Sequence, residues 1–494
     1  MRSILLLATA ALLSSASAAP WTDHYTLEDI ALPPDVPPEV GGLSFDTEGT
    51  LYVCLRRGDV LRAKPVADPK AFAWSHFASG FHNGCGIDSP APGRVVISQM
   101  PELSEAIDTD HDGLADTYNR LGDGWGLSGN YHETNALCSD GKGGYYLAIG
   151  TASLNGPTFL HTRDEYSKFG RRGRNFSSVK YRGWVLHYAA DGARTPIASG
   201  FRMHNGIYQD PDGHLWCGDN QGDWKATTPL YLVEKGHFYG HPSSLVWDEK
   251  WPADQDPLLT YRNDLDAYNK HRTRAAVQIP HMEMNRSAAE PMEFPRDGSF
   301  SKAFAGQLLL PDNNGTRITR IMLDEVNGQL QGSCTHFVDG NGLRSGNNRL
   351  RFSPDGKSLY VGQTVRGWGK VAEGLQRITT KDRDPFDLSA IHLTKTGFQL
   401  TFTEDLPKDA IKAEHFQTNS FTYQSTWAYG GPMNDKKKHQ ITALKQPTPN
   451  SVELTIPDLA PGRIYRLDLS NFKSTAGTDL HNHLFFYTAN QLPN

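Results

Sequence analysis

The feature that most constrains the fold is a short unit that recurs along the chain. Each unit has a turn rich in Asp, Gly or Pro, then an alternating strand, then another polar turn. The units begin at Asp46, Ala91, Ser139, Asp210, Phe304 and Ser353. Asp-Gly and Pro-Asp-Gly favour tight turns because glycine accepts positive φ and proline presets φ. The β-branched, aromatic and leucine residues that follow suit a pleated, half-buried surface. Six such units, with few long helical patterns, predict an all-β fold, a six-bladed β-propeller.

The spacing of the units is uneven, so the middle blades must carry long loops. One insertion covers residues 166–181 and is rich in Arg and Lys, and another covers residues 247–286. A β-sandwich is the structural alternative, but this many units would need two sandwiches.

The pattern changes near residues 381–386. Phe398, Leu400 and Phe402 alternate with polar residues, and "SVELTIPDL", "RIYRLDL" and "HLFFYTAN" follow. Short alternating strands with Pro/Gly turns predict a separate immunoglobulin-like β-sandwich. The expected domains are therefore a propeller at residues 19–385 and a sandwich at residues 386–494.

The first 18 residues predict a secretory signal peptide. They carry one basic residue, an apolar run and a small-residue exit that ends at Ala18. The apolar run is too short to span a bilayer, and no later run is long enough, so we expect a periplasmic or secreted protein. Cleavage removes Arg2 and takes the formal net charge from −6 to −7. This mild acidity disfavours nucleic acid as a partner.

Five cysteines are present without a CxxC motif, which gives no support to a zinc ribbon or an attached c-type haem. Export permits disulfides, and Cys54–Cys85 is the pairing expected first. The odd number leaves at least one cysteine outside any intrachain pair.

The sequence "DTDHDGLAD" has the spacing of a calcium loop. Asp108, Asp110, Asp112 and Asp116 take positions 1, 3, 5 and 9, Gly113 takes position 6, and Leu114 supplies a carbonyl at position 7. Position 12 is Asn119, so the loop is not an EF-hand and is nearer to the short calcium loops of extracellular modules. We expect calcium to hold this loop together. The alternative is an acidic surface turn without an ion.

Loops at one end of a propeller converge on the central channel, and several carry polar side chains. The candidates are His132, Arg202, His204, Asn205, Asp219, Asn220, Gln221, His237, His241, Arg349 and Arg351. Each has a structural alternative, such as a hydrogen-bonded histidine, a loop-holding arginine or a surface ion pair. A chemical role requires that they meet in one pocket.

Residues 200–242 carry a resemblance to a known family. "GFRMHNG", "CGDNQGDW" and "GHFYGHP" are similar, in order, to three motifs of the soluble quinoprotein glucose dehydrogenases and the wider glucose/sorbosone dehydrogenase family. The segment from His132 to "YYLAIG" resembles the family's segment that begins with the catalytic histidine. The likeness spans roughly residues 40–370, and the C-terminal part resembles a bacterial Ig-like module.

The resemblance implies a cofactor, pyrroloquinoline quinone (PQQ), together with calcium. It implies that His132 is the general base and that Arg202 stabilises charge on the quinone. Asn205 and Asn220 would bind the cofactor, Gln221 would contact its calcium, and Arg349 and Arg351 would bind cofactor carboxylates. The chain departs from the family at Met203, where the family has asparagine, and at Thr151, where it has aspartate.

The expected function is PQQ- and calcium-dependent oxidation of a small-molecule carbohydrate by hydride transfer to the quinone, followed by reduction of an electron acceptor. A calcium-dependent hydrolase or lyase on the same scaffold is one alternative, with ligands from Asp219, Asn220 and Glu133. A non-catalytic carbohydrate-binding propeller is another.

Overall fold

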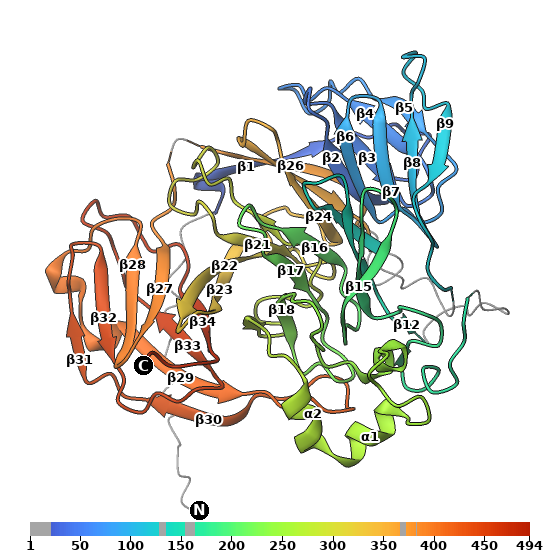
Figure 1. Ribbon diagram of the computed structural model, residues 1–494. Coiled ribbons are helices and arrows are strands. Elements are labelled where there is room, and N and C mark those ends of the chain that lie inside the picture. Colours follow the sequence, from blue (N-terminus) through green and yellow to red (C-terminus); the bar gives the residue numbers. More distant parts are fainter. Residues whose placement is uncertain (1–20, 128–134, 154–163, 366–371, 382) are drawn as a thin grey trace, which may run out of the picture.

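Each predicted unit forms the hairpin between the first two strands of a four-stranded antiparallel sheet. The computed structural model describes residues 21–127, 135–153, 164–365, 372–381 and 383–494. The signal-peptide prediction lies outside these residues. Five four-stranded sheets and four strands of an eight-stranded sheet are the six blades of a propeller, which confirms the predicted fold class (Figure 1).

The first three blades follow one another along the chain. Blade 1 comprises β2 (Val40–Phe45), β3 (Leu51–Leu55), β4 (Val60–Ala63) and β5 (Ser75–Ala78). Blade 2 comprises β6 (Gly86–Ala91), β7 (Arg94–Ser98), β8 (Leu103–Ile107) and β9 (Thr117–Arg120). Blade 3 comprises β10 (Asn135–Ser139), β11 (Tyr145–Ile149), β14 (Trp184–Tyr188) and β15 (Arg194–Ser199).

The other three blades complete the ring. Blade 4 comprises β16 (Gly206–Gln209), β17 (Leu215–Gly218), β18 (Thr228–Leu232) and β19 (Val277–Ile279). Blade 5 comprises β20 (Met292–Glu293), β21 (Leu308–Pro311), β22 (Arg317–Val326) and β23 (Gln329–Asp339). Blade 6 comprises β24 (Asn347–Phe352), β25 (Ser358–Gln363), β26 (Gly374–Thr380) and the N-terminal β1 (Tyr25–Ile30).

The innermost strands close around a central axis. β2 contacts β6, β6 contacts β10, β10 contacts β16, and β24 contacts β2. Between blades 4 and 5 the backbones approach so closely that a Cβ atom on Gly206 would lie 2.1 Å from the Glu290 Cα atom. Glycine is therefore required at that point of the ring. Pairing of β1 with β26 joins the N-terminal segment to the last blade.

One of the two predicted insertions contains the α-helices of the propeller. Residues 247–286 carry α1 (Pro257–Asn263) and α2 (Leu265–His271), after the 3₁₀ helix η2 (Pro242–Trp247). The basic insertion holds β13 (Asn175–Phe176), which pairs with β12 (Ala152–Ser153). A 3₁₀ helix, η1 (Trp21–Asp23), precedes β1. No helix of the described residues is both long and apolar enough to cross a membrane.

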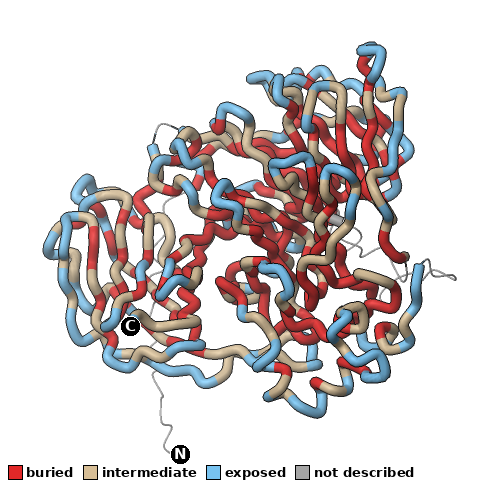
Figure 2. The backbone as a smooth tube through the Cα atoms, viewed as in Figure 1, coloured by how far each residue is buried: buried red, intermediate tan, exposed pale blue. Residues whose placement is uncertain are grey.

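The C-terminal part is a two-sheet β-sandwich. One sheet comprises β27 (Leu388–Thr394), β28 (Gly397–Phe402), β32 (Ser451–Thr455) and β31 (Ala443–Lys445). The other contains β34 (Leu484–Ala489), β33 (Arg463–Leu469), β29 (Phe416–Thr422) and β30 (Asn434–His439). Two 3₁₀ turns, η3 (Lys408–Ala410) and η4 (Ala413–His415), precede β29. The predicted alternation in β28 is confirmed, because Phe398, Leu400 and Phe402 are buried in the hydrophobic core of the sandwich. Buried segments run through the sandwich as they do through the propeller, and its outer loops are exposed (Figure 2).

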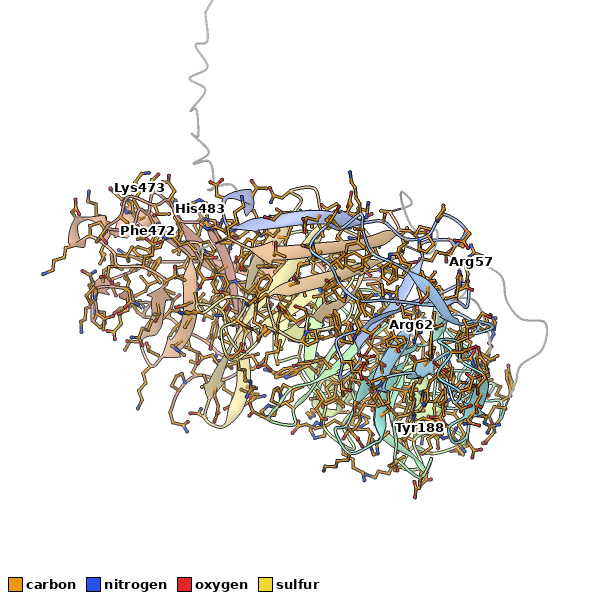
Figure 3. The ribbon with its side chains drawn as sticks, turned by 90° about the horizontal axis from the view of Figure 1, so that it is seen from above. Arg57, Arg62, Tyr188, Phe472, Lys473 and His483 are labelled. Carbon is orange, nitrogen blue, oxygen red and sulfur yellow. The ribbon has the colours of Figure 1, made fainter. Side chains whose placement is uncertain are left out.

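The sandwich is not separate from the propeller, which differs from the expectation. β34 pairs with the outer strand of blade 5, and Cys334 lies opposite Phe486, so one eight-stranded sheet runs through both parts. Seen from above, Phe472 and Lys473 mark the sandwich end of the molecule and Arg57 and Arg62 mark the blade 1 end (Figure 3).

The cysteines do not form the expected Cys54–Cys85 pair, because both are free thiols. The Cys54 Sγ atom faces the Leu55 carbonyl, and the Cys85 Sγ atom faces Asn83 Oδ1. Burial holds the pKa of the Cys54 thiol well above its usual range, so this thiol is neutral and unreactive.

Candidate active site

A cavity of about 240 Å³ lies where innermost strands of the propeller begin. Cys85 precedes β6, Asn205 precedes β16 and Asn348 lies at the start of β24, and all three line it. The cavity is somewhat smaller than common sites for drug-sized ligands, which occupy about 300–1,000 Å³, and this suits a compact ligand. The structure therefore brings loops that are distant in sequence to one polar pocket.

The lining of the cavity is cationic. Arg56, Arg174, Arg202 and Arg286 all line it, and among its described lining residues there is no Asp or Glu. Burial, and then the charge of Arg286, lower the pKa of His281, so this lining imidazole is neutral at neutral pH. Guanidinium groups match the planar geometry of carboxylates, so this donor set suits an anionic ligand.

Arg202 is held firmly at the cavity wall. Its Nε donates to Asp223 Oδ1 at 2.7 Å, its Nη2 donates to Asn175 Oδ1 at 2.7 Å, and its Nη1 donates to the Gln221 carbonyl at 3.3 Å. His241 Nε2 lies 3.3 Å from the second oxygen of Asp223. Burial alone would raise the pKa of Asp223, but His241 and Arg202 lower it well below its usual range. A permanent carboxylate therefore positions the guanidinium.

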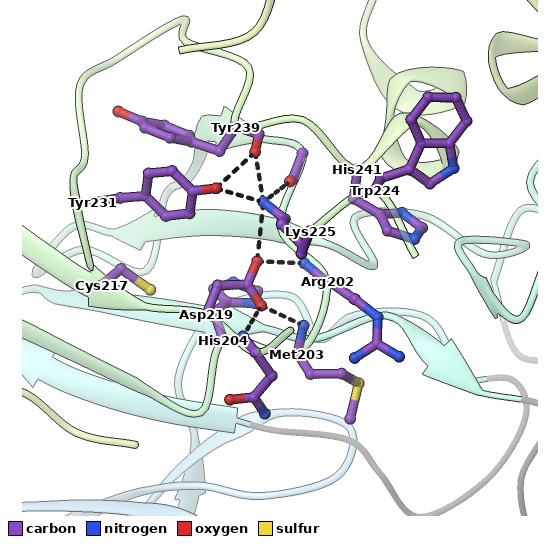
Figure 4. Close-up of polar contacts among 12 residues, drawn as sticks. Arg202, Met203, His204, Cys217, Asp219, Trp224, Lys225, Tyr231, Tyr239 and His241 are labelled. Carbon is purple, nitrogen blue, oxygen red and sulfur yellow. Dashed lines mark hydrogen bonds and ion pairs between the residues drawn. The ribbon is translucent and has the colours of Figure 1, made fainter. Parts of the chain in front are cut away.

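A second buried carboxylate fixes the backbone of the same loop (Figure 4). Asp219 follows β17 and accepts from the backbone N–H groups of Arg202 at 2.9 Å and Met203 at 2.8 Å. The Lys225 ammonium lies 3.1 Å from Asp219, and both side chains are almost fully buried. On the other side, the Thr151 hydroxyl donates to the Arg202 carbonyl at 2.6 Å. Burial would raise the pKa of Asp219, and the charge of Lys225 lowers it.

Three further predicted residues line the cavity with Arg202. The Asn205 amide donates to Asn348 Oδ1 at 2.7 Å. Asn220 Oδ1 is buried without a hydrogen-bond partner among the described residues. Gln221 donates to the Ala226 carbonyl at 3.1 Å. An unpaired buried amide oxygen is costly, so Asn220 has an acceptor left for a ligand.

Arg349 and Arg351 lie outside the cavity lining. Arg349 is buried and donates to carbonyls of Cys85, Asn205 and Asn348, which ties together blades 2, 4 and 6. Arg351 donates to the Leu43 carbonyl at 3.0 Å and to Glu290 Oε1 at 3.2 Å, which ties blade 1 to the segment before blade 5. Both guanidiniums thus hold blades together at the axis, which differs from the predicted contact with a cofactor.

Other predicted histidines have structural surroundings. His204 is fully buried outside the cavity lining, and its Nε2 donates to the Trp184 carbonyl at 3.1 Å. His237 lies near the surface, 3.4 Å from Glu234. The prediction for His132 falls outside the described residues, as does that for Glu133. Asn135, three residues after His132, begins β10, the innermost strand of blade 3.

The acidic loop lies between β8 and β9 in blade 2. Carboxylate oxygens of Asp108, Asp110 and Asp116 lie within 4.8 Å of one another. Asp108 Oδ1 is buried without a hydrogen-bond partner among the described residues. Hydrogen bonds from Thr109, first of all its hydroxyl, lower the pKa of Asp116 to about 2. Converging carboxylates and an unpaired buried oxygen fit a calcium ion.

The remaining predicted ligands are arranged differently. Asp112 accepts from the Leu114 backbone N–H at 2.8 Å, and Asp112 is outside the converging group. The Leu114 side chain is exposed, and only its carbonyl was predicted as a ligand. Gln221 lines the cavity, whereas none of the four aspartates of the acidic loop does, so the predicted calcium contacts fall into two groups.

Most of the other residues that line the cavity were missed by the sequence analysis, among them the charged or aromatic residues Arg56, Arg174, Arg286 and Tyr429. The Arg/Lys-rich composition of residues 166–181 was the available signal for Arg174. Tyr429 belongs to the sandwich, and nothing in the pattern there indicates a contact with the propeller.

No protein-family model matches the sequence, and no curated protein matches it. Among solved structures, a family AA12 carbohydrate-active enzyme of Trichoderma reesei is similar with a TM-score of 0.51 at 13% identity, over 74% of this chain and 97% of that chain. A PQQ-bound aldose sugar dehydrogenase of Streptomyces coelicolor gives a TM-score of 0.48 at 15% identity, over 72% and 98% of the two chains. The first likeness supports the propeller fold.

Proposed function

We propose that the protein oxidises a small-molecule carbohydrate with PQQ as its cofactor and calcium as its metal ion. The observation that carries the proposal is the arginine-lined cavity, which has no carboxylate among its described lining residues. PQQ is a compact, flat molecule with three carboxylates, and such a ligand requires cationic partners. The Trichoderma reesei structure of similar fold is also that of a carbohydrate-active enzyme.

The chain offers distinct groups for this chemistry. Arg202 and Arg56 would pair with carboxylate or quinone oxygens, and Asn205 and Asn220 would supply amide hydrogen bonds. When bound, PQQ supplies an electrophilic carbonyl that accepts hydride from the sugar. Arg202 is already oriented by Asp223 and Asn175, so little reorganisation is needed when negative charge develops beside it.

His132 is the proposed base that accepts the proton of the oxidised sugar hydroxyl. An imidazole has a pKa near working pH, which general-base catalysis requires. Gln221 is the proposed contact to a calcium ion beside the cofactor, and the acidic loop is proposed as a separate calcium site that stabilises blade 2. The proposed location is the periplasm or the medium, with an electron acceptor as the second substrate.

A calcium-dependent hydrolase has less support from the cavity. Such a site needs carboxylates around a channel ion. Asp219 is fully buried and is engaged by Lys225 and two backbone N–H groups. The described lining supplies amides and cations instead.

The test is reconstitution of the purified protein with calcium and PQQ. We expect stoichiometric PQQ binding by calorimetry and reduction of an artificial electron acceptor when a panel of aldoses is supplied. His132→Ala is expected to retain PQQ affinity and to lose about 10²- to 10⁴-fold in kcat, the usual contribution of a general base.

His392→Ala is the matched control, because His392 lies on the sandwich and pairs with Asp324 at 3.0 Å. It should keep full activity. Absence of PQQ binding, or lactone and glycoside turnover without PQQ, would refute the proposal. A third outcome is that the parent protein binds sugar without turnover and that His132→Ala leaves this binding unchanged. This outcome would indicate a carbohydrate-binding protein.

A further inference from the structure

The loop between β29 and β30 reaches from the sandwich to the propeller cavity. This segment, residues 423–433, is called the arm below. Its contacts are mainly backbone hydrogen bonds: Trp224 N–H donates to the Thr426 carbonyl at 2.7 Å, and Gly430 N–H donates to the Gly222 carbonyl at 2.9 Å. Gly431 N–H likewise donates to Ala226. The arm is therefore docked on the propeller loop that carries Asn220, Gln221 and Asp223.

The docking is close at Gly430. This residue has φ of +67°, and a Cβ there would lie 2.8 Å from the Gln221 side chain. Glycine satisfies both the left-handed backbone and the lack of space. The arm is thus shaped to lie against a residue that itself lines the cavity.

The arm places one aromatic ring in the cavity wall. Tyr429 lines the cavity, and the guanidiniums of Arg174 and Arg202 lie over its ring at 4.8 Å and 5.3 Å from the centroid. Tyr429 is 56% exposed, so burial of its ring contributes little to docking. Among the described residues, Arg174 has no carboxylate partner, and it too is exposed.

An aromatic face attracts cations and lowers the cost of holding two guanidiniums close together. Three protein acceptors engage Arg202, which leaves its other N–H groups for a ligand. No hydrogen bond or ion pair engages the Arg174 guanidinium within the described parts of the chain, and this group lies in the same wall of the cavity. Together these groups offer two cationic forks on one aromatic support, and a carboxylate matches that geometry.

We propose that Tyr429, Arg174 and Arg202 form a carboxylate-binding subsite shared by the sandwich and the propeller. That the full ligand is PQQ rests on the proposed function. That the subsite binds a carboxylate rests on the cavity alone. The sandwich then contributes directly to ligand binding through its arm, and Tyr429 is a positioning residue for the two arginines.

The test is calorimetric titration, in calcium buffer, with PQQ and with benzene-1,3,5-tricarboxylate, a flat tricarboxylate without a quinone. Arg174→Gln is expected to weaken binding of both compounds about tenfold, since it removes a charge-assisted hydrogen bond to a ligand carboxylate. Tyr429→Ala is expected to weaken binding of both compounds about three- to fivefold, since a cation–π pair at an exposed ring contributes that much. Tyr429→Phe keeps the ring and should bind within about twofold of the parent protein. The double variant should lose less than the product of the two single losses.

Trp427→Ala is the matched control. Trp427 lies on the same arm and is 45% exposed, but it packs under Arg262 and lies outside the cavity lining. Its loss should leave both affinities unchanged. Arg174→Gln decides the question if Tyr429→Ala lowers the melting temperature, because Arg174 is an exposed side chain.

The outcomes separate the two proposals. Binding of PQQ by the parent with unchanged affinities in Tyr429→Ala and Arg174→Gln overturns the subsite and leaves the proposed function standing. Tyr429-dependent binding of the tricarboxylate without PQQ binding upholds the subsite and overturns the proposed function. Binding of neither compound overturns both.

Discussion

At the scale of single residues, a series of polar contacts compensates the buried charges beside the cavity. Ser243 Oγ lies 2.9 Å from His241 Nδ1, His241 contacts Asp223, and Asp223 accepts from Arg202. A buried charge without partners is costly, and each partner here removes part of that cost. Of these four residues, only Arg202, at the end of the series of contacts, lines the cavity.

His204 leads to a prediction about pH. Its ring is fully buried, stacks on Phe201 with centroids 4.4 Å apart, and has a pKa lowered by burial to about 4. Between that value and about 6.5 the unfolded chain binds a proton that the folded protein does not. The free energy of unfolding therefore rises with pH over this window. As the pH falls through this window, the free energy of unfolding decreases by up to about 3 kcal/mol because of this histidine.

His204→Phe should flatten that dependence. The substitution keeps a flat ring beside Phe201 and removes the titrating group. Urea unfolding of both proteins between about pH 4 and pH 6.5 measures the slopes, since these values are the pKa of His204 in the folded protein and the ordinary pKa of histidine. Parallel slopes would show that His204 does not carry the effect.

At the scale of elements, the β8–β9 loop is the part whose stability we expect to depend on calcium. With calcium at about a hundred times its dissociation constant, binding to the folded state alone adds about 2.7 kcal/mol to the free energy of unfolding. The melting temperature of the PQQ-free protein should rise with calcium. Asp108→Asn should abolish most of that rise, because Asp108 supplies the unpaired buried oxygen.

Asp212→Asn is the control for this experiment. Asp212 belongs to a second acidic group with Asp210 and His214, but it is paired with Arg296 at 2.7 Å. The calcium-dependent rise should persist in that variant. An equal rise in Asp108→Asn and the parent would remove the loop from consideration as a calcium site.

The elements also show what the sequence could predict. The six turn-and-strand units became the first hairpins of the six blades, because Asp-Gly turns and alternating strands are local signals. Arg202, Asn205, Asn220 and Gln221 were found because a propeller gathers loops that follow its strands. The Arg349 side chain donates to backbone carbonyls from three different blades, so its role between blades was not visible in the local pattern.

At the scale of the whole molecule, the propeller and sandwich share structure in three ways. They share the eight-stranded sheet, the arm at the cavity and a hydrophobic cluster in which Trp216 and Leu230 of blade 4 pack with Phe421 and Phe486 of the sandwich. A buried ion pair between Arg320 and Asp387, at 2.8 Å, joins the parts where the chain passes between them. The strand pattern changes at that point, but shared packing leaves no sequence signature, so a separate module was expected.

This sharing predicts that the two parts unfold together. Calorimetry of the full chain should give one transition, with calorimetric and van't Hoff enthalpies in agreement. Phe486→Ala opens a cavity in the shared cluster and should shift that entire transition, at a cost of about 3–5 kcal/mol. Leu259→Ala, at an exposed position on α1, should leave it in place.

A chain that ends at residue 385 tests the same point from the other side. Truncation exposes the edge of β23 and the face of Cys334 and Leu230 that the sandwich covers, and an exposed apolar strand edge promotes aggregation. We therefore expect the fragment to be insoluble or to melt far below the full chain. Two outcomes would show that the propeller folds independently and that the shared sheet contributes little to its stability. One is two resolved transitions of which Phe486→Ala shifts only one, and the other is a soluble fragment with the parent's melting temperature.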